Sequence, residues 1–175
     1  MRMDSLSFST RSSSSWAETV TEAEQVVVWA FRHWISGHTH GRGAHWSIAW
    51  RHLSDLCGSA DGTRAVTALE GMIRAICLNA IRPISYHQPH CPCIGEDERT
   101  LIELLGACQR RQWLNAANHA KRLVGDEGAG SLIETAARFA TLLAEHGHHL
   151  PICGPRPVEQ RDVPLALSTP LGGLH

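Results

Sequence analysis

The chain has 175 residues, of which 43% are hydrophobic, and 16 basic side chains against 17 acidic ones give a formal charge of −1. This size and composition fit one globular domain and exclude wholesale disorder. The charge balance argues against nucleic acid as the main partner, because attraction to phosphate requires clustered positive charge. The longest uncharged apolar run is too short to cross a bilayer, and no secretory signal opens the chain, so we expect a cytoplasmic protein with no membrane partner.

Three regions are predicted along the chain. Residues 1–18 are rich in serine and predict a flexible N-terminus, and residues 19–147 carry helical periodicity. Residues 148–175 are rich in proline and glycine and predict a flexible tail. No internal repeat or convincing strand pattern is present. We therefore predict an all-α, single-domain bundle of about six helices with a central loop rich in proline, cysteine and histidine.

The first helix is predicted over residues 21–36. Thr21 and Glu24 have the spacing of a capping box, and Gly37 predicts the end of the helix. The consecutive apolar residues 26–31 cover most of its circumference, and such a helix is normally covered on all sides. We expect it to be central to the bundle; the alternative is that one face contacts another subunit.

The second and third helices are predicted after a loop at 37–43 that is rich in glycine and histidine. The second spans about 44–57, and Asp61 or Thr63 caps the third. Apolar residues of the third helix recur at alternating spacings of three and four, which is the strongest amphipathic pattern in the chain. These residues are Val66, Leu69, Ile73, Ile76 and Ala80.

Three more helices are predicted in the second half of the chain. The fourth begins after Gly95 with three acids, which the helix dipole favours at that position. The fifth, near 112–124, and the sixth, near 131–147, are separated by a loop with three glycines. Their predicted buried faces consist of Leu101, Leu104, Leu105 and Cys108 in the fourth, Trp113, Ala116, Ala117, Ala120 and Val124 in the fifth, and Leu132, Ala136, Phe139, Leu142 and Leu143 in the sixth.

Residues 87–93 carry a candidate metal site between the third and fourth helices. Prolines interrupt the helical pattern there, and four ligating side chains fall within seven residues: His87, His90, Cys91 and Cys93. Imidazole and thiolate are the donors that zinc prefers, and iron also uses them. The prolines restrict the backbone before a metal binds, and the dipole of the following helix stabilises a thiolate at Cys93. We predict that these four residues bind zinc, with iron as the alternative.

The conformation of the loop selects among these ligands. In a β-like segment His87, Cys91 and Cys93 share one face and His90 points away. In a polyproline-like segment His87, His90 and Cys93 line one edge, and all four converge only if the chain bends. Two alternatives to metal binding remain: a stiff connector whose side chains pack against helices, and a redox pair whose disulfide would close a tight, easily reduced ring.

The other cysteines and histidines have simpler interpretations. All six thiols are predicted to be reduced, and Cys57, Cys77 and Cys108 lie on apolar helical faces as small core residues. His38, His40 and His45 could bind a second metal, although we favour a solvated turn. The histidines at 146–149 fit a helix end, where positive charge is favoured.

Three functions from different classes follow. We favour a small metal-binding helical protein, regulatory or accessory, that acts by contact with another protein or with itself through the first helix. A DNA-binding regulator with a metal- or thiol-sensing loop is the first alternative, because a short turn precedes a helix with outward polar residues; these are Gln112, Asn115, Asn118, Lys121 and Arg122. A metal-dependent or redox enzyme is the second, although no motif for a catalytic nucleophile is present.

Overall fold

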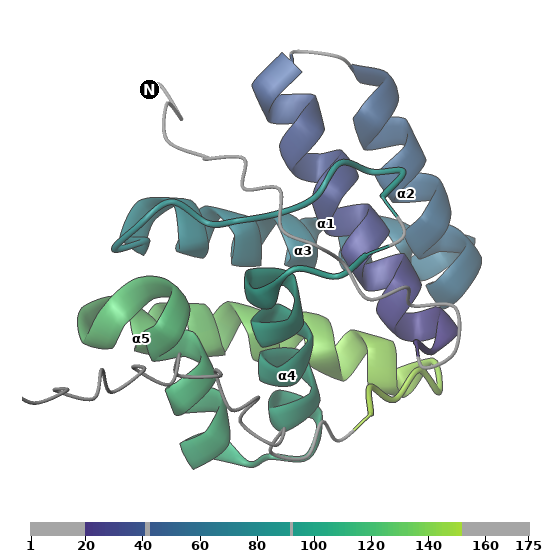
Figure 1. The fold of residues 1–175 in the computed structure, drawn as a ribbon. Coiled ribbons are helices and arrows are strands. Elements are labelled where there is room, and N and C mark those ends of the chain that lie inside the picture. Colours follow the sequence, from purple (N-terminus) through teal and green to yellow (C-terminus); the bar gives the residue numbers. More distant parts are fainter. Residues whose placement is uncertain (1–19, 41–42, 92, 152–175) are drawn as a thin grey trace, which may run out of the picture.

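The structure is a computed structural model and describes residues 20–40, 43–91 and 93–151. All regular secondary structure in these ranges is helical (Figure 1). The helices are α1 (Glu22–His40), α2 (Gly43–Cys57), α3 (Ser59–Asn79), α4 (Glu96–Gln109) and α5 (Trp113–Glu145). None of them is both long enough and apolar enough for a membrane span. The predicted N-terminal segment 1–18 lies outside the described residues.

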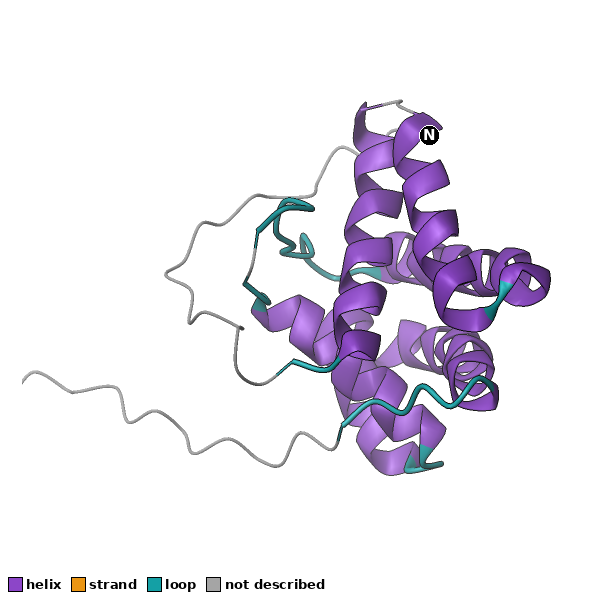
Figure 2. Ribbon diagram, turned by 90° about the vertical axis from the view of Figure 1, so that its right-hand side faces the viewer, coloured by secondary structure: helices purple, strands orange, loops and turns teal. Residues whose placement is uncertain are grey.

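The helices pack in a continuous order that leaves one long connection on the outside. Helix α1 packs against α2, α2 against α3, α3 against α5, and α5 against α4. The connection between α3 and α4 is extended, and it runs back along α1 before it turns into α4 (Figure 1). Figure 2 shows the same connection as a loop on the flank of the helical body. The candidate metal residues lie in this loop.

The first helix begins as predicted and ends later than predicted. The N–H of Thr21 donates to Glu24 Oε2 over 2.8 Å, and the N–H of Glu24 donates to Thr21 Oγ1 over 3.3 Å, which is a capping box. The prediction that Gly37 ends the helix is wrong, since α1 continues to His40. Gly37 instead permits close packing, because a Cβ there would lie 2.3 Å from Nε1 of Trp46 on α2.

Most of the apolar run of α1 is buried inside the chain, but Val26 and Trp29 are only partly buried, and α1 packs mainly against α2 and not at the centre of the bundle. Val27, Val28 and Ala30 are fully buried, and Phe31 is 2% exposed. Most residues of the predicted faces of the later helices form the core, but Ala80 just beyond α3 is exposed, and Val66 and Ala117 are only partly buried. Trp113 is 52% exposed, and Cys77 lies at the exposed surface of α3.

The described residues contain five helices because the predicted fifth and sixth helices form one element. Gly125, with φ of 73°, is the only residue inside α5 that departs from helical geometry. The predicted loop is therefore reduced to a kink. Gly128 is helical and buried, and a Cβ there would lie 2.5 Å from Cβ of Asn79, so this glycine lets α3 and α5 approach closely.

The first residues of the predicted tail pack against the bundle. The N–H of Leu150 donates to Gln109 Oε1 over 2.8 Å, and the Leu150 side chain is 2% exposed. His148 Nε2 lies 2.6 Å from the carbonyl oxygen of Leu56. The prediction for the remaining segment, 152–175, concerns residues outside the described ranges.

Candidate metal and thiol site

The buried side chain of Arg32 links the loop to α1 and α4. Arg32 of α1 is 0% exposed, and its Nε and Nη2 donate to the two carboxylate oxygens of Glu98 on α4 over 2.6 and 2.8 Å. Its Nη1 donates to the carbonyl oxygens of Gln88 and Cys91 over 3.3 and 2.8 Å, and Nη2 also donates to the carbonyl oxygen of Cys93. One guanidinium therefore connects α1, α4 and the loop main chain.

Glu98 extends the hydrogen-bond network of Arg32 to His87. The carboxylate accepts hydrogen bonds from the main-chain N–H groups of Gly95 (2.8 Å) and His87 (3.1 Å), and His87 Nδ1 lies 3.2 Å from Oε2. Burial alone would raise the pKa of Glu98, but the hydrogen bonds and charge of Arg32, with the two N–H groups, lower it below its usual value. Because an ionised carboxylate only accepts, the His87 ring donates to it through its Nδ1–H.

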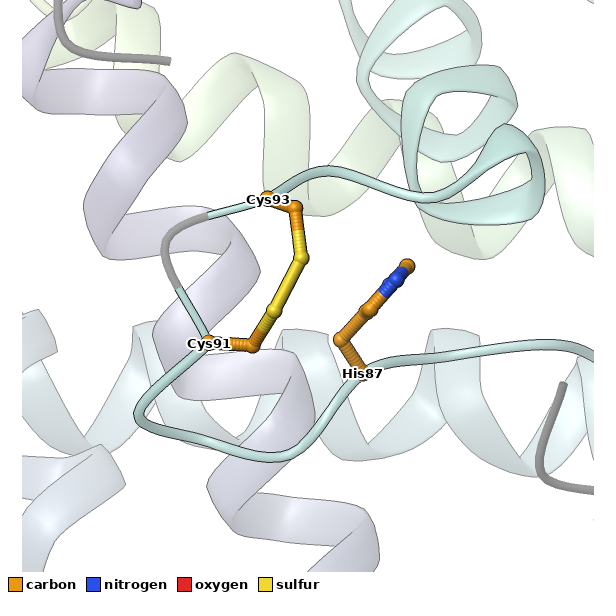
Figure 3. Close-up of side chains that lie close together, drawn as sticks. All are labelled: His87, Cys91 and Cys93. Atoms are coloured by element: carbon orange, nitrogen blue, oxygen red, sulfur yellow. A yellow bond between two sulfur atoms is a disulfide. The ribbon is translucent and has the colours of Figure 1, made fainter. Parts of the chain in front are cut away.

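Cys91 and Cys93 form a disulfide, with their Cα atoms 5.4 Å apart. The prediction that all thiols are reduced is therefore wrong for these two. The cause is a local bend, in which the N–H of Cys91 donates to the carbonyl oxygen of Gln88 over 3.0 Å while Arg32 holds the carbonyls of both cysteines. Figure 3 shows His87 beside the disulfide.

Three of the four predicted ligands come together in the loop. A ring nitrogen of His87 and the sulfur atoms of Cys91 and Cys93 lie within 4.8 Å of one another. His90 lies elsewhere, with its ring centroid 6.5 Å from that of His33 on α1. A β-like segment would give the same three residues, but here the turn closed by the Cys91 N–H and the Gln88 carbonyl brings them together.

A second carboxylate holds the start of the loop. Asp97 binds Arg82 through two contacts of 2.6 and 2.8 Å and accepts the N–H of Ser85 over 2.8 Å. Burial opposes ionisation of Asp97, but Arg82 and the N–H of Ser85 hold its pKa below the usual value. The acids at the start of α4 thus serve the loop as well as the helix dipole.

Sequence reasoning missed Arg32 and Glu98 as site residues. One signal was available: Arg32 follows directly on the apolar run of α1, and an arginine in a central helix requires a buried partner. The identity of that partner was not available, because Glu98 is 66 residues away in sequence. Glu98 by itself reads as an ordinary acid of the first helical turn.

The remaining candidates have structural roles. Burial raises the pKa of the Cys57 thiol and raises that of Cys108 to about 11, so both stay protonated. His146 ends α5 with Nε2 3.0 Å from Asp61 Oδ2. The side chains of His38 and His40 lie outside the described part.

The outward polar face of α5, which motivated the DNA-binding alternative, is partly neutralised by acids. Lys121 Nζ lies 2.6 Å from Asp126 Oδ1, and Arg122 Nη2 lies 3.2 Å from Glu96 Oε1. No family model, curated protein or solved structure matches this chain. The function is therefore proposed from the geometry of the loop.

Proposed function

We propose that the protein is a metal-binding helical module whose loop binds zinc through His87, Cys91 and Cys93 when the disulfide is reduced. The observation that carries the proposal is the convergence of these three donors within 4.8 Å beside a histidine that a buried carboxylate orients. Iron is the alternative metal, because it accepts the same donors.

Reduction has to spread the two sulfur atoms before they can bind zinc. Bonds of about 2.0 Å to nitrogen and 2.3 Å to sulfur in a tetrahedron place the donor atoms roughly 3.5–3.8 Å apart. The sulfur atoms are bonded to each other in the disulfide, at a shorter separation than this, and the His87 nitrogen lies within 4.8 Å of both, so rotation of the freed cysteine side chains has to supply the adjustment. The loop main chain need not be rebuilt, because Arg32 binds the carbonyl groups rather than the sulfur atoms.

The surroundings of His87 support a metal-binding role over simple packing. Metal-binding histidines usually donate their second ring N–H to a carboxylate, which fixes the tautomer and strengthens the ligand. Glu98 occupies this position at Nδ1, and Arg32 and Gly95 orient Glu98 in turn. The network exists in the oxidised loop, so the ordering cost of binding is partly met before the metal arrives.

Thiol redox state then controls the site. An external dithiol attacks one sulfur of the disulfide to give a mixed disulfide, and its second thiol displaces the remaining cysteine. Two electrons and two protons pass to Cys91 and Cys93, and the reductant leaves as its own disulfide. Zinc then displaces the two thiol protons on binding.

Three protein ligands leave a fourth coordination position, which water or a side chain of another protein would fill. A site that opens only on reduction and completes its coordination from outside suits a regulatory or accessory role. This is why we favour action through contact with another protein.

The test is a metal assay of the full chain in both redox states. Reduced wild type is expected to retain one equivalent of zinc more than oxidised wild type by ICP-MS, because reduction frees the two sulfur donors of the loop. The Cys91→Ser, Cys93→Ser double variant should lose the reduction-dependent zinc. Cys77→Ser is the matched control, because it removes an exposed thiol outside the loop. The proposal fails if reduced wild type retains no stoichiometric zinc, or if Cys77→Ser loses as much as the double variant.

A redox enzyme is the second candidate, and the Cys91–Cys93 disulfide itself favours it. In this case a cysteine thiolate of the reduced loop attacks a substrate disulfide, and the other cysteine resolves the mixed disulfide. The substrate leaves reduced, and a dithiol regenerates the pair. Turnover of a model disulfide with dithiothreitol, lost in the double variant and kept in Cys77→Ser, would establish this activity. No acceleration over dithiothreitol alone would exclude it.

A further inference from the structure

Four histidine rings from three segments gather beside the loop, around His33 of α1. The ring centroid of His33 lies 5.4 Å from that of His45 and 6.2 Å from that of His52, both on α2. It lies 6.5 Å from that of His90 in the loop. His33 is 7% exposed, whereas His90 reaches the surface, so the cluster extends from the interior to the solvent.

We propose that His33, His45 and His90 form a second metal site, which binds a divalent transition ion such as Zn²⁺, Cu²⁺ or Co²⁺ through imidazole nitrogens alone. Imidazole suits these ions, and three nitrogen donors with open positions are a common arrangement for them. The inference does not rest on the function proposed for the cysteine loop, because it uses no sulfur donor.

The facing nitrogens of His33 and His45 carry most of this inference. Their Nδ1 atoms lie 3.1 Å apart. Two nitrogens at about 2.0–2.1 Å from one tetrahedral zinc ion are roughly 3.3 Å apart, so the pair is already spaced as ligands. At most one proton fits between two ring nitrogens at this distance, and a metal ion takes the place of that proton.

His90 is a better third ligand than His52. His45 and His52 are seven residues apart on α2, which separates them by about 10.5 Å along the helix axis, with His33 near both. One ion therefore reaches His45 and His52 together only with difficulty. His52 also packs against Trp29 in a tilted ring contact, with ring centroids 5.5 Å apart. His90 comes from a different segment and approaches His33 edge to face, at an interplanar angle of 81°.

The test is equilibrium dialysis of Co²⁺ against the full chain in its oxidised form, in which the disulfide blocks the sulfur donors of the loop. We expect one equivalent bound, with cobalt d–d bands and no thiolate-to-cobalt charge-transfer band. His45→Gln and His90→Gln should each weaken binding at least tenfold. His52→Gln, the matched control from the same cluster, should bind within about threefold of wild type.

Two results would overturn the second site. The first is cobalt affinity in His45→Gln that equals that of wild type. The second is a loss in His52→Gln as large as that in His45→Gln. His33→Gln is added with a check of folding by circular dichroism, and if it unfolds, the half-buried His45 decides the question. A thiolate charge-transfer band that appears only after reduction belongs to the cysteine loop, so failure of one site is distinguishable from failure of the other.

Discussion

The cysteine loop and the histidine cluster draw on the same short segment, but different forces hold them. At the cysteine loop, Arg32 and Glu98 form an ion pair with both side chains 0% exposed, and further hydrogen bonds run from this pair to Cys91, Cys93 and His87. In the histidine cluster the ring centroids of His45, His52 and His90 lie 5.4 to 6.5 Å from that of His33 in tilted or edge-to-face contacts, and one nitrogen contact of 3.1 Å joins His33 to His45.

The two sites therefore differ in which interactions fix the positions of their side chains. A buried ion pair tolerates few geometries, because a charge without its partner in the interior is very unfavourable. Contacts between tilted or edge-on imidazole rings tolerate many geometries. We therefore expect the cysteine loop to keep its shape without metal, and the histidine cluster to gain most of its order from an ion.

The largest loss of stability is expected when Arg32, which binds the main chain of the cysteine loop, is replaced. Arg32→Ala leaves Glu98 buried without its partner and should lower the free energy of unfolding by about 3–5 kcal/mol, measured by urea denaturation. Arg82→Ala is the matched control, since Arg82 is 46% exposed and should cost less. Equal losses in the two variants would show that the buried pair does not hold the loop.

The second test uses metal-free protein and compares the pH ranges in which the histidine cluster and the carboxylates beside the cysteine loop lose their contributions to stability. Because the pKa of His33 is lowered to about 4 from 6.5, the unfolded chain binds this proton more tightly, and stability falls as the pH drops between these values. The loss should be on the order of 3 kcal/mol, and His33→Gln should remove it. Glu98 and Asp97, whose pKa values are also lowered, lose their contributions only as the pH falls below about 4. Urea denaturation of both proteins from pH 7 to pH 4 measures the difference, and equal slopes would contradict it. The groups facing His33 are His45, His52 and His90.

A smaller effect is expected from reduction of the disulfide. The bond joins residues two apart, and a loop this short restricts the unfolded chain little, so it should contribute about 1.5 kcal/mol or less. Unfolding with and without reductant, in the presence of a chelator, measures this contribution. The Cys91→Ser, Cys93→Ser variant should show no reductant effect. A loss approaching that of Arg32→Ala would mean that sulfur, rather than the guanidinium, holds the loop.

The smallest expected effect concerns the position of His87. In Gly95→Ala, the new Cβ would lie 3.0 Å from both Cε1 and Nδ1 of His87, so the ring must move by a few tenths of an ångström. The zinc affinity of the reduced protein should fall about threefold to tenfold, within roughly 1.4 kcal/mol. Gly130→Ala is the control, since nothing lies within 4 Å of its Cβ position. Cobalt binding at the histidine cluster should not change in either variant.

Much of the fold follows from local patterns in the sequence. The capping box at Thr21 and Glu24 and the start of α4 at Glu96 form as predicted, because both depend on residues within one helical turn. The helix end predicted at Gly37 is wrong, because α1 continues to His40. The glycine loop predicted after Val124 is reduced to a break in helical geometry at Gly125, where φ is 73°. At Gly37 the glycine serves contact with Trp46, a residue of another helix, and a local pattern cannot reveal this.

The candidate site also combines features that the sequence predicts with features that only the tertiary structure reveals. The residue types of the loop predict four donors but leave open whether His90 or Cys91 joins His87 and Cys93, and a turn at Cys91 decides for Cys91. Neither the disulfide nor the second group around His33 follows from the sequence. Both depend on the path of the loop along α1, which Arg32 fixes through residues about 60 positions away.

The sequence by itself determined where helices form and which short segment concentrates imidazole and sulfur, since periodicity, capping and donor chemistry act over a few neighbouring residues. Only the tertiary structure decided which donors meet. That choice depends on a buried charge satisfied across the bundle and on helices that approach where glycine leaves room. Both are properties of packing between segments far apart in the chain.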